Sequence, residues 1–169
     1  HAAGLALHAK WRADQKAFEA SLGENVRVEW YSYNAGPSAM EALLIDAIDL
    51  TYVGPNPALN AYTRSKGADV RVIAGATFGG AALLIQAESQ IKIAKDFAGK
   101  KIGTPQLGNT QDVAARAWLL DNGIHVTQTG GDAQVIPAEN PDLLSLFSRR
   151  ELDAVWTVEP WVTRLEKEA

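Results

Sequence analysis

The chain has 169 residues, of which 47% are hydrophobic and 21% are charged, and this composition is typical of an ordinary globular protein. It contains no cysteine, which excludes thiolate catalysis and cysteine-ligated zinc. Its formal net charge is −4 and its basic residues are scattered, whereas a nucleic-acid-binding protein is expected to carry a basic face. We therefore expect no nucleic-acid partner, and a bound anion would have to be held by a few well-placed donors.

Helices and strands are predicted to alternate in the first part of the chain. Ser38 is a candidate N-cap, with Glu41 in the capping-box position three residues later. The predicted elements are a helix over 2–20, a strand over 26–30, a helix over 38–44, a strand over 48–53, a helix over 58–64 and a strand over 70–74. Regular alternation of this kind favours an α/β domain with largely parallel strands.

A second α/β unit is predicted beyond the glycine pair Gly79-Gly80, where we place a crossover. The elements expected from there are strands over 81–86, 101–104, 133–136 and 152–156, and helices over 113–122, over 143–150 and from 159–161 onward. We therefore divide the chain into a first lobe, 1–87, and a second lobe, 88–169.

The sequence shows no recognisable catalytic or metal-binding pattern. The three histidines, His1, His8 and His125, have no metal-ligand spacing, and the sequence has no nucleophile elbow, zinc-protease motif or P-loop. We expect no catalytic residue, no metal and no cofactor.

Four junctions place a polar loop between a strand and a helix, at 35–39, 54–57, 108–111 and 157–161. A helix N-terminus presents unpaired N–H groups and a partial positive charge, which together favour an anion. Each junction also has a purely structural explanation, since Ser38 and Thr110 can be helix caps and Trp156 can belong to a core.

Two of these loops carry more polar or aromatic side chains than a helix cap requires. The first contains Asn109, Thr110 and Gln111, which we expect to line a ligand cleft. The second, 156–161, places Trp156 and a second indole around Glu159, and aromatic walls with a few polar groups are typical of concave sites.

Five segments, taken in order, resemble the nitrate/sulfonate/taurine-type substrate-binding proteins of bacterial ABC transporters. They are residues 34–43, 49–55, 99–105, 107–116 and 152–161, and together they span essentially the whole chain. The resemblance implies a type II periplasmic-binding-protein fold, in which two α/β lobes close on a ligand. It places the following residues on the two walls of the cleft: Ser38, Asn56, Gly79 and Gly80 on one, and Asn109, Thr110, Gln111, Trp156 and Glu159 on the other.

The chain also departs from that family pattern. Family members are longer, so we expect a fragment whose first lobe lacks its first strand and its return segment. The chain begins at His1 without a leader sequence, which favours a start inside a larger protein. The segments Ile45-Asp46-Ala47 and Arg149-Arg150-Glu151 stand where the family usually carries a glycine.

The function implied by the resemblance is that of the solute-binding component of an ABC importer. Its ligand would be a small oxyanion, most simply an aliphatic sulfonate or taurine, with nitrate and bicarbonate as further candidates. Its partner would be the membrane permease, and its location periplasmic or extracellular and membrane-anchored. The alternatives are a thiamine-pathway enzyme that makes the pyrimidine precursor, and a ligand-sensing domain of a regulator.

Glu159 has two explanations. If the ligand also carries an ammonium group, as taurine does, the carboxylate of Glu159 could pair with it. Alternatively, Glu159 lies in the first turn of its helix, where the macrodipole favours a negative charge, and does not touch the ligand.

Overall fold

The computed structural model describes residues 17, 19–23 and 25–169. Most of the helix predicted over 2–20 lies outside these residues, although residues 17 and 19–22 at its end are helical. Among the described residues, no helix combines the length and apolar character needed to cross a membrane.

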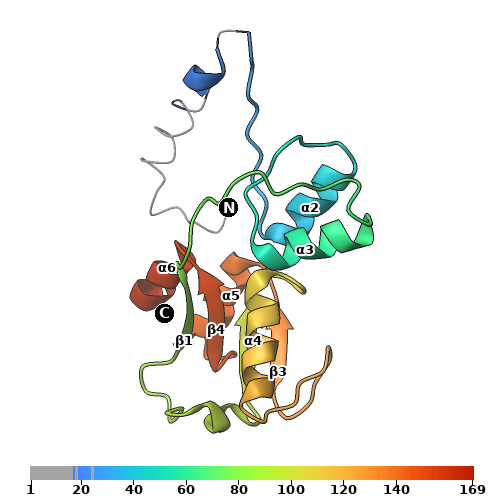
Figure 1. Cartoon of the computed structure of the whole chain (residues 1–169). Coiled ribbons are helices and arrows are strands. Elements are labelled where there is room, and N and C mark those ends of the chain that lie inside the picture. The colour runs from blue at the N-terminus through green and yellow to red at the C-terminus, as the bar shows by residue number, and fades with distance from the viewer. Residues whose placement is uncertain (1–16, 18, 24) are drawn as a thin grey trace.

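A four-stranded sheet organises the lower part of the molecule (Figure 1). Its strands are β1 (Ala81–Ile85), β2 (Lys101–Thr104), β3 (Gln134–Pro137) and β4 (Ala154–Val158), in the spatial order β1-β4-β2-β3. Strands β2, β3 and β4 are parallel, and β1 runs antiparallel to β4. The carboxyl ends of the three parallel strands therefore lie at one edge of the sheet.

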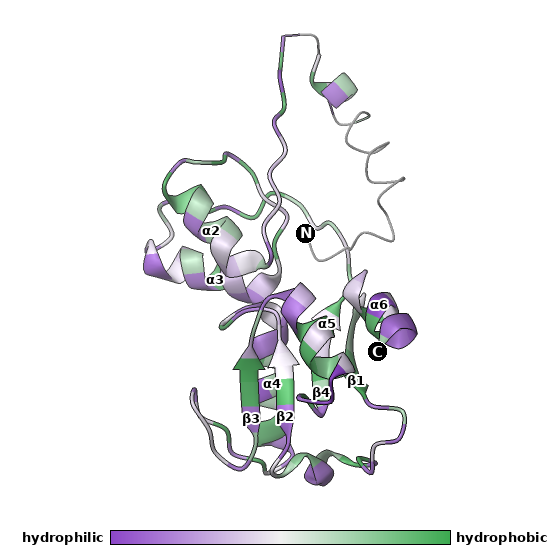
Figure 2. Ribbon diagram, turned by 180° about the vertical axis from the view of Figure 1, so that it is seen from behind, coloured by the Kyte–Doolittle hydropathy of each residue, from purple (hydrophilic) through white to green (hydrophobic). Residues whose placement is uncertain are grey.

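Helices cover both faces of this sheet. α4 (Thr110–Asp121) packs on one face, and α5 (Asn140–Ser148) and α6 (Trp161–Glu168) pack on the other, which Figure 2 shows from behind. Neighbouring strand residues point to opposite faces, so Ala154 packs in the α4 cluster and Val155 in the α5–α6 cluster. A short 3-10 helix, η2 (Ala94–Phe97), contributes Phe97 to the α4 cluster.

Gly103 in β2 allows α5 to approach the sheet closely. A Cβ at this position would lie 2.6 Å from Leu143 and 2.8 Å from Leu152, which is closer than side chains pack. The glycine thus fixes the distance between the sheet and the amino-terminal half of α5.

A second, smaller body lies above the carboxyl edge of the sheet (Figure 1). It consists of α2 (Gly36–Leu44) and α3 (Pro55–Arg64), which pack together around Met40, Ala61 and Val70. Extended segments connect these helices to each other and to β1.

Three strands predicted for this body do not form. Residues 26–30, 48–53 and 70–74 belong to no helix or strand, and they pair with no strand among the described residues. A strand is stabilised by hydrogen bonds to a neighbouring strand, and alternation within one segment cannot supply that neighbour. Val72 and Ile73 are accordingly 81% and 78% exposed. The prediction of these strands was wrong.

The boundary of the sheet and the start of α2 also differ from prediction. β1 pairs with β4 over its full length, so the sheet of the second lobe already includes residues 81–85, which precede the predicted lobe start at residue 88. The N-cap of α2 is Ala35, and α2 has no side-chain cap. The predicted capping box of Ser38 and Glu41 is therefore wrong, because the helix begins at Gly36 and already includes both residues.

Candidate ligand-binding site

The amino-terminal ends of four helices gather at the carboxyl edge of the sheet (Figure 1). α4 and α5 begin shortly after β2 and β3, and α2 and α3 reach the same region from the smaller body. α3 contacts α4 directly. The starts of α2 and α3 are also in contact, since a Cβ at Gly36 would lie 2.7 Å from Pro57. Unpaired N–H groups of several helices are thus brought together.

Asn109 begins α4 as its N-cap. Its Oδ1 accepts a hydrogen bond of 2.7 Å from the backbone N–H of Asp112, and its Nδ2 donates to Oε1 of Gln111 at 3.2 Å. Both Asn109 and Gln111 are buried. α4 therefore starts at Thr110, three residues before the predicted start, because the cap lies within the polar loop.

Asp112 ties the same loop together. Its carboxylate accepts hydrogen bonds from Thr104 Oγ1 at 3.1 Å and from the Gly108 N–H at 3.0 Å, and it forms an ion pair of 3.1 Å with Arg116. The side chain is buried, with 2% exposed. Much of the polar content of residues 108–112 is therefore structural.

Thr110 is the exception in this loop. Its Oγ1 is the one buried side-chain nitrogen or oxygen atom without a hydrogen-bond partner among the residues that the structure describes. The hydroxyl lies against Gly54, the N-cap residue of α3, in the space that a Cβ at position 54 would need. It is thus located where the amino-terminal ends of α3 and α4 meet.

The first turn of α3 carries few donors of its own. Two prolines, Pro55 and Pro57, flank Asn56 and have no N–H group. Asn56 is half-buried, and its backbone N–H has no partner within the helix because it belongs to the first turn. Asn56 therefore belongs to the start of α3 and Thr110 to the start of α4, the two helix ends that meet here.

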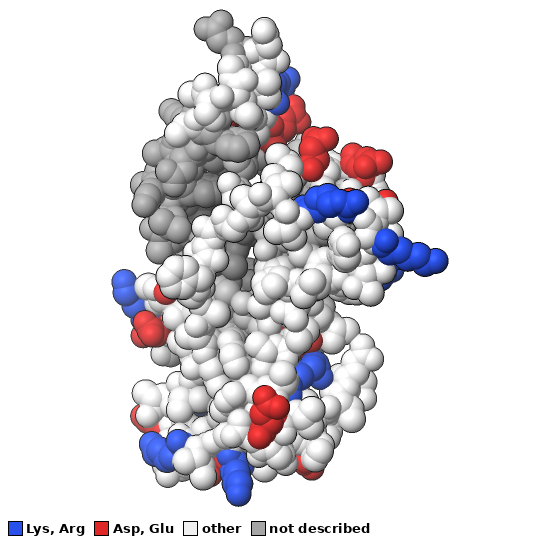
Figure 3. Space-filling view, viewed as in Figure 1, with Lys and Arg blue, Asp and Glu red and all other residues white. Residues whose placement is uncertain are grey.

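A small cavity of about 190 Å³ lies between the start of α2 and the loops that follow β2 and β3, and neither Asn56 nor Thr110 lines it. Its lining residues are Asn34, Ser38, Pro105, Gln106, Leu107, Pro137, Ala138 and Glu139. Ser38 Oγ and Gln106 Nε2 are 2.9 Å apart and join the two bodies across the cavity. Of the residues predicted for the site, Ser38 lines this cavity. In the face shown in Figure 3, charged side chains gather mainly over the smaller body and near the far end of the sheet, and the band between them is mostly uncharged.

Asn34 forms the second bridge between the bodies. Its Nδ2 donates to the carbonyl oxygen of Pro105 at 2.9 Å, and its Oδ1 accepts from the backbone N–H of Asn140 at 3.2 Å. Oδ1 of Asn140 in turn accepts a 2.6 Å hydrogen bond from the hydroxyl of buried Thr157. These bonds connect the smaller body to the ends of β2 and β4 and to the start of α5.

None of the bridging residues Asn34, Gln106, Asn140 and Thr157 was predicted as a ligand-binding residue. One signal was available, since Asn34 and Gln106 stand in polar loops beside the predicted helices, and Asn140 precedes a proline at a predicted helix start. Their mutual contacts could not be read from the sequence, because 106 residues separate Asn34 from Asn140.

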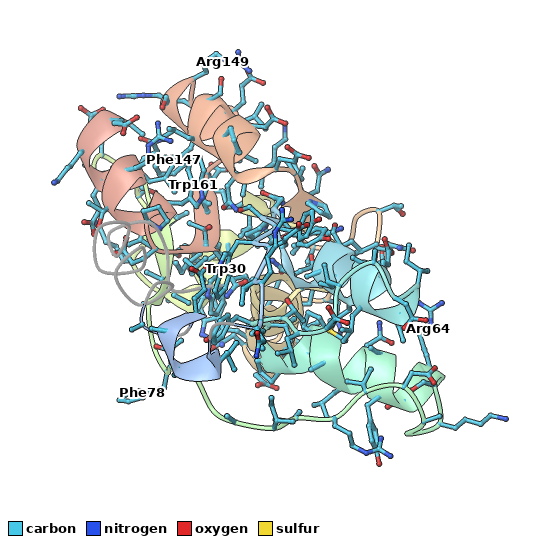
Figure 4. The ribbon with its side chains drawn as sticks, turned by 90° about the horizontal axis from the view of Figure 1, so that it is seen from above. Trp30, Arg64, Phe78, Phe147, Arg149 and Trp161 are labelled. Atoms are coloured by element: carbon cyan, nitrogen blue, oxygen red, sulfur yellow. The ribbon has the colours of Figure 1, made fainter. Side chains whose placement is uncertain are left out.

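Trp156 is half-buried on the α4 face of the sheet. Its ring meets Trp118 edge-to-face with centroids 6.1 Å apart, and Trp118 meets Phe97 in the same way at 5.3 Å. Trp161 is further along, on α6, where Arg164 lies 4.7 Å above its ring. Seen from above, Trp161 is on the side of the molecule away from α2 and α3 (Figure 4). Neither indole lines the cavity.

The carboxylate of Glu159 accepts two hydrogen bonds at the start of α6. Its Oε1 accepts from Thr163 Oγ1 at 3.0 Å and its Oε2 accepts from the Thr163 N–H at 3.2 Å. Its own N–H donates to the carbonyl oxygen of Gly80 at 2.9 Å. Gly79 and Gly80 are exposed and have φ values of 75° and 74°, so both adopt the left-handed conformation immediately before β1.

Comparison with known proteins places this geometry in context. The taurine-binding periplasmic protein of Escherichia coli (strain K12) is 23% identical over 141 residues, which are 83% of this chain and 42% of that protein. The alkanesulfonate-binding protein SsuA from Xanthomonas axonopodis pv. citri, bound to MOPS, superposes with a TM-score of 0.73 and 23% identity, covering 95% of this chain and 52% of that one. The periplasmic aliphatic sulphonate binding protein SsuA from Escherichia coli gives 0.63 and 20%, covering 99% and 54%.

These structural matches confirm the predicted α/β fold of the periplasmic-binding-protein type. The chain spans about half the length of the relatives it matches. The model of the NMT1-like family matches residues 9–169, which is nearly the whole sequence. On this evidence, the chain belongs to the NMT1-like family.

Proposed function

We propose that the chain is the ligand-binding part of an extracytoplasmic receptor that delivers a small oxyanion to an ABC permease. An aliphatic sulfonate or taurine is the first choice of ligand. The observation that carries the proposal is the buried, unpartnered hydroxyl of Thr110 at the meeting point of α3 and α4.

An oxyanion would satisfy this hydroxyl. A buried polar group without a partner costs about 1–3 kcal/mol, and a sulfonate oxygen that accepts from Thr110 Oγ1 would remove that cost. The surrounding helix N-termini add N–H donors and a favourable dipole for the negative charge. Neutral donors of this kind can hold an anion in a region of few cationic side chains.

The size of the cavity lined by the loop that leads into α4 favours a small solute. The cavity of about 190 Å³ lies below the roughly 300–1,000 Å³ that is usual for drug-sized ligands. Nitrate and bicarbonate are smaller oxyanions that would use the same donors, so the binding test includes them.

The relatives support binding in preference to catalysis by a thiamine-pathway enzyme. The proteins compared above are described as taurine-, alkanesulfonate- and aliphatic sulphonate-binding. A periplasmic or membrane-anchored extracellular location and a permease partner follow from the same proposal.

Isothermal titration of the protein with ethanesulfonate, taurine, nitrate and bicarbonate tests this function. Thr110→Val keeps the shape of the side chain and removes the donor. We expect sulfonate affinity to fall about tenfold or more, since a hydrogen bond to a charged group contributes roughly 1.5–3 kcal/mol. Thr63→Val is the matched control, because Thr63 is exposed on α3 and bonds its own helix.

Two results would count against the proposal. If the wild-type protein bound neither sulfonate, sulfonate reception would be excluded. If Thr110→Val bound as tightly as the wild type, the anion would have to lie away from the start of α4.

A further inference from the structure

The side-chain amide of Asn109 has an orientation that the backbone fixes. Its Oδ1 accepts a hydrogen bond of 2.7 Å from the N–H of Asp112, and a backbone N–H can only donate. The oxygen of this amide therefore faces the first turn of α4, and its Nδ2 is turned to the other side. The residue is 3% exposed, so the protein around it leaves little room for the amide to turn over.

The amide of Gln111 takes its orientation from that of Asn109. Nδ2 of Asn109 donates to Oε1 of Gln111 at 3.2 Å. An amide nitrogen donates and does not accept, so only the oxygen of Gln111 can meet Nδ2. The Nε2 group of Gln111 consequently points away from Asn109.

Nε2 of Gln111 is a donor without an acceptor. Gln111 is 8% exposed, and none of the described residues accepts a hydrogen bond from its Nε2. Thr110 Oγ1 is the one fully buried side-chain atom that lacks a partner in the described part of the chain, so Nε2 belongs to the small part of Gln111 that remains accessible. The start of α4 thus presents two adjacent free donors, a hydroxyl and an amide NH2.

We propose that Asn109 is a positioning residue of the anion site. It does not touch the ligand, but it holds the Gln111 amide with the NH2 group free, as a second donor beside the hydroxyl of Thr110. The reversed amide would present Oε1, whose partial negative charge repels an oxyanion. This inference rests on the proposed function, since it assigns a further role within the same site.

Two substitutions of Asn109 keep the cap and change the orientation of Gln111. Serine and aspartate are both good N-caps that can accept from Asp112. Asn109→Ser has no amide to donate to Oε1, so the Gln111 amide is free to turn over. Asn109→Asp places an oxygen that only accepts beside Gln111, which favours the reversed amide.

Titration with ethanesulfonate measures the consequence. We expect Asn109→Ser to weaken binding about twofold or more, because the competent orientation of Gln111 is then only partly populated. Asn109→Asp should weaken it about tenfold or more, the scale of one charge-assisted hydrogen bond. Thermal unfolding of each variant verifies that the protein is folded during the titration.

Gln111→Met provides the matched background, since methionine has a similar length and no amide. In that background Asn109→Ser should have no further effect on ethanesulfonate binding. Asn109→Asp should retain only the repulsion by its added charge, which salt screens. NMR of the side-chain amides adds a readout other than affinity: the Nε2 signal of Gln111, identified by its loss in Gln111→Met, should shift with ethanesulfonate in the wild type.

The outcomes separate this inference from the general function. Wild-type affinity in both Asn109 variants, or equal losses with and without Gln111, would overturn the role of Asn109 and leave sulfonate binding intact. The same holds if the Nε2 signal does not respond in a wild type that binds ethanesulfonate. Failure of the wild type to bind would overturn the proposed function and this role with it.

Discussion

The hydroxyl of Thr110 occupies the space beside Gly54 in which any larger residue would place its Cβ. This contact joins the first residue of α4 to the N-cap of α3. Gly54 has φ −70° and ψ 162°, a conformation that any residue adopts, so the glycine is needed for space and not for backbone freedom. The approach of the two helices therefore depends on the absence of one methyl group.

Gly54→Ala should separate the two helix ends and weaken anion binding. The added methyl group overlaps Thr110, and overpacking of this kind typically costs about 1–3 kcal/mol. Urea unfolding and sulfonate titration measure the two effects. Gly75→Ala is the control, because a Cβ at Gly75 meets nothing within 4 Å. Unchanged stability and affinity in Gly54→Ala would show that the contact is not maintained in solution.

Thr157→Val should destabilise the protein although the two side chains have the same shape. The buried Thr157 hydroxyl donates to Asn140 Oδ1 at 2.6 Å, and its removal leaves a buried acceptor unpaired at a cost of about 1–3 kcal/mol. Asn140 also donates to Asn34, so the bridge between the bodies should loosen as well. Thr77→Val, at an exposed position, serves as the control in chemical unfolding. Equal stability of both variants would contradict the argument.

Asp112→Asn tests whether the polar loop is held by its carboxylate. The variant removes the charge that pairs with Arg116 and accepts from Thr104 and Gly108. We expect a loss of roughly 3 kcal/mol in unfolding free energy, the lower end of the range for a broken buried pair, because 20% of the Arg116 side chain is exposed.

The control for that variant is Glu168→Gln. Its partner Arg164 is at the same helical spacing, but both side chains of the pair are largely in solvent, with 43% and 46% exposed. Exposed pairs contribute little, so this variant should unfold like the wild type. If the two variants lost equal stability, burial of Asp112 would not be the cause.

The local sequence pattern was sufficient to predict the strands in the second half of the chain. β1, β2, β3 and β4 each overlap a predicted strand, because their residues alternate between two helix-covered faces or lie in short apolar runs. The starts of α2 and α4 were placed too late, since Ala35 and Asn109 are their N-caps. A cap within a polar loop is easily counted as part of the loop.

The remaining features, which are the pairing of strands and the contacts of the site, depend on residues that are distant in the sequence. The alternation in 70–74 resembles a strand, but pairing requires a neighbour that one segment cannot specify. The site shows the same limit: Thr110 and Asn109 could be named from their loop, whereas Asn34 meets Asn140 across 106 residues.

Three helices end on residues that adopt the left-handed conformation without being glycine. Asp46, Lys66 and Arg150 have φ values of 56°, 53° and 58°. Each is followed by a residue whose N–H bonds back to the last turn; after Arg150, the N–H of Glu151 donates to the carbonyl oxygen of Leu146 at 2.9 Å. This is the Schellman arrangement, which usually has glycine at the left-handed position. Two of these residues, Asp46 and Arg150, fall in the segments where the family pattern led us to expect a glycine.

Arg150→Gly should therefore stabilise the protein. The left-handed conformation costs a side-chain-bearing residue roughly 1–2 kcal/mol, and the greater freedom of glycine in the unfolded chain offsets about 0.5–1 kcal/mol of the gain. The ion pair with Glu88 that the variant removes is exposed and contributes little. We expect a net rise of up to about 1 kcal/mol in unfolding free energy. Arg149→Gly, one residue earlier at φ −83°, is the matched control and should be destabilising, because its backbone is already favourable for arginine. Destabilisation by both substitutions would mean that α5 does not end in this turn.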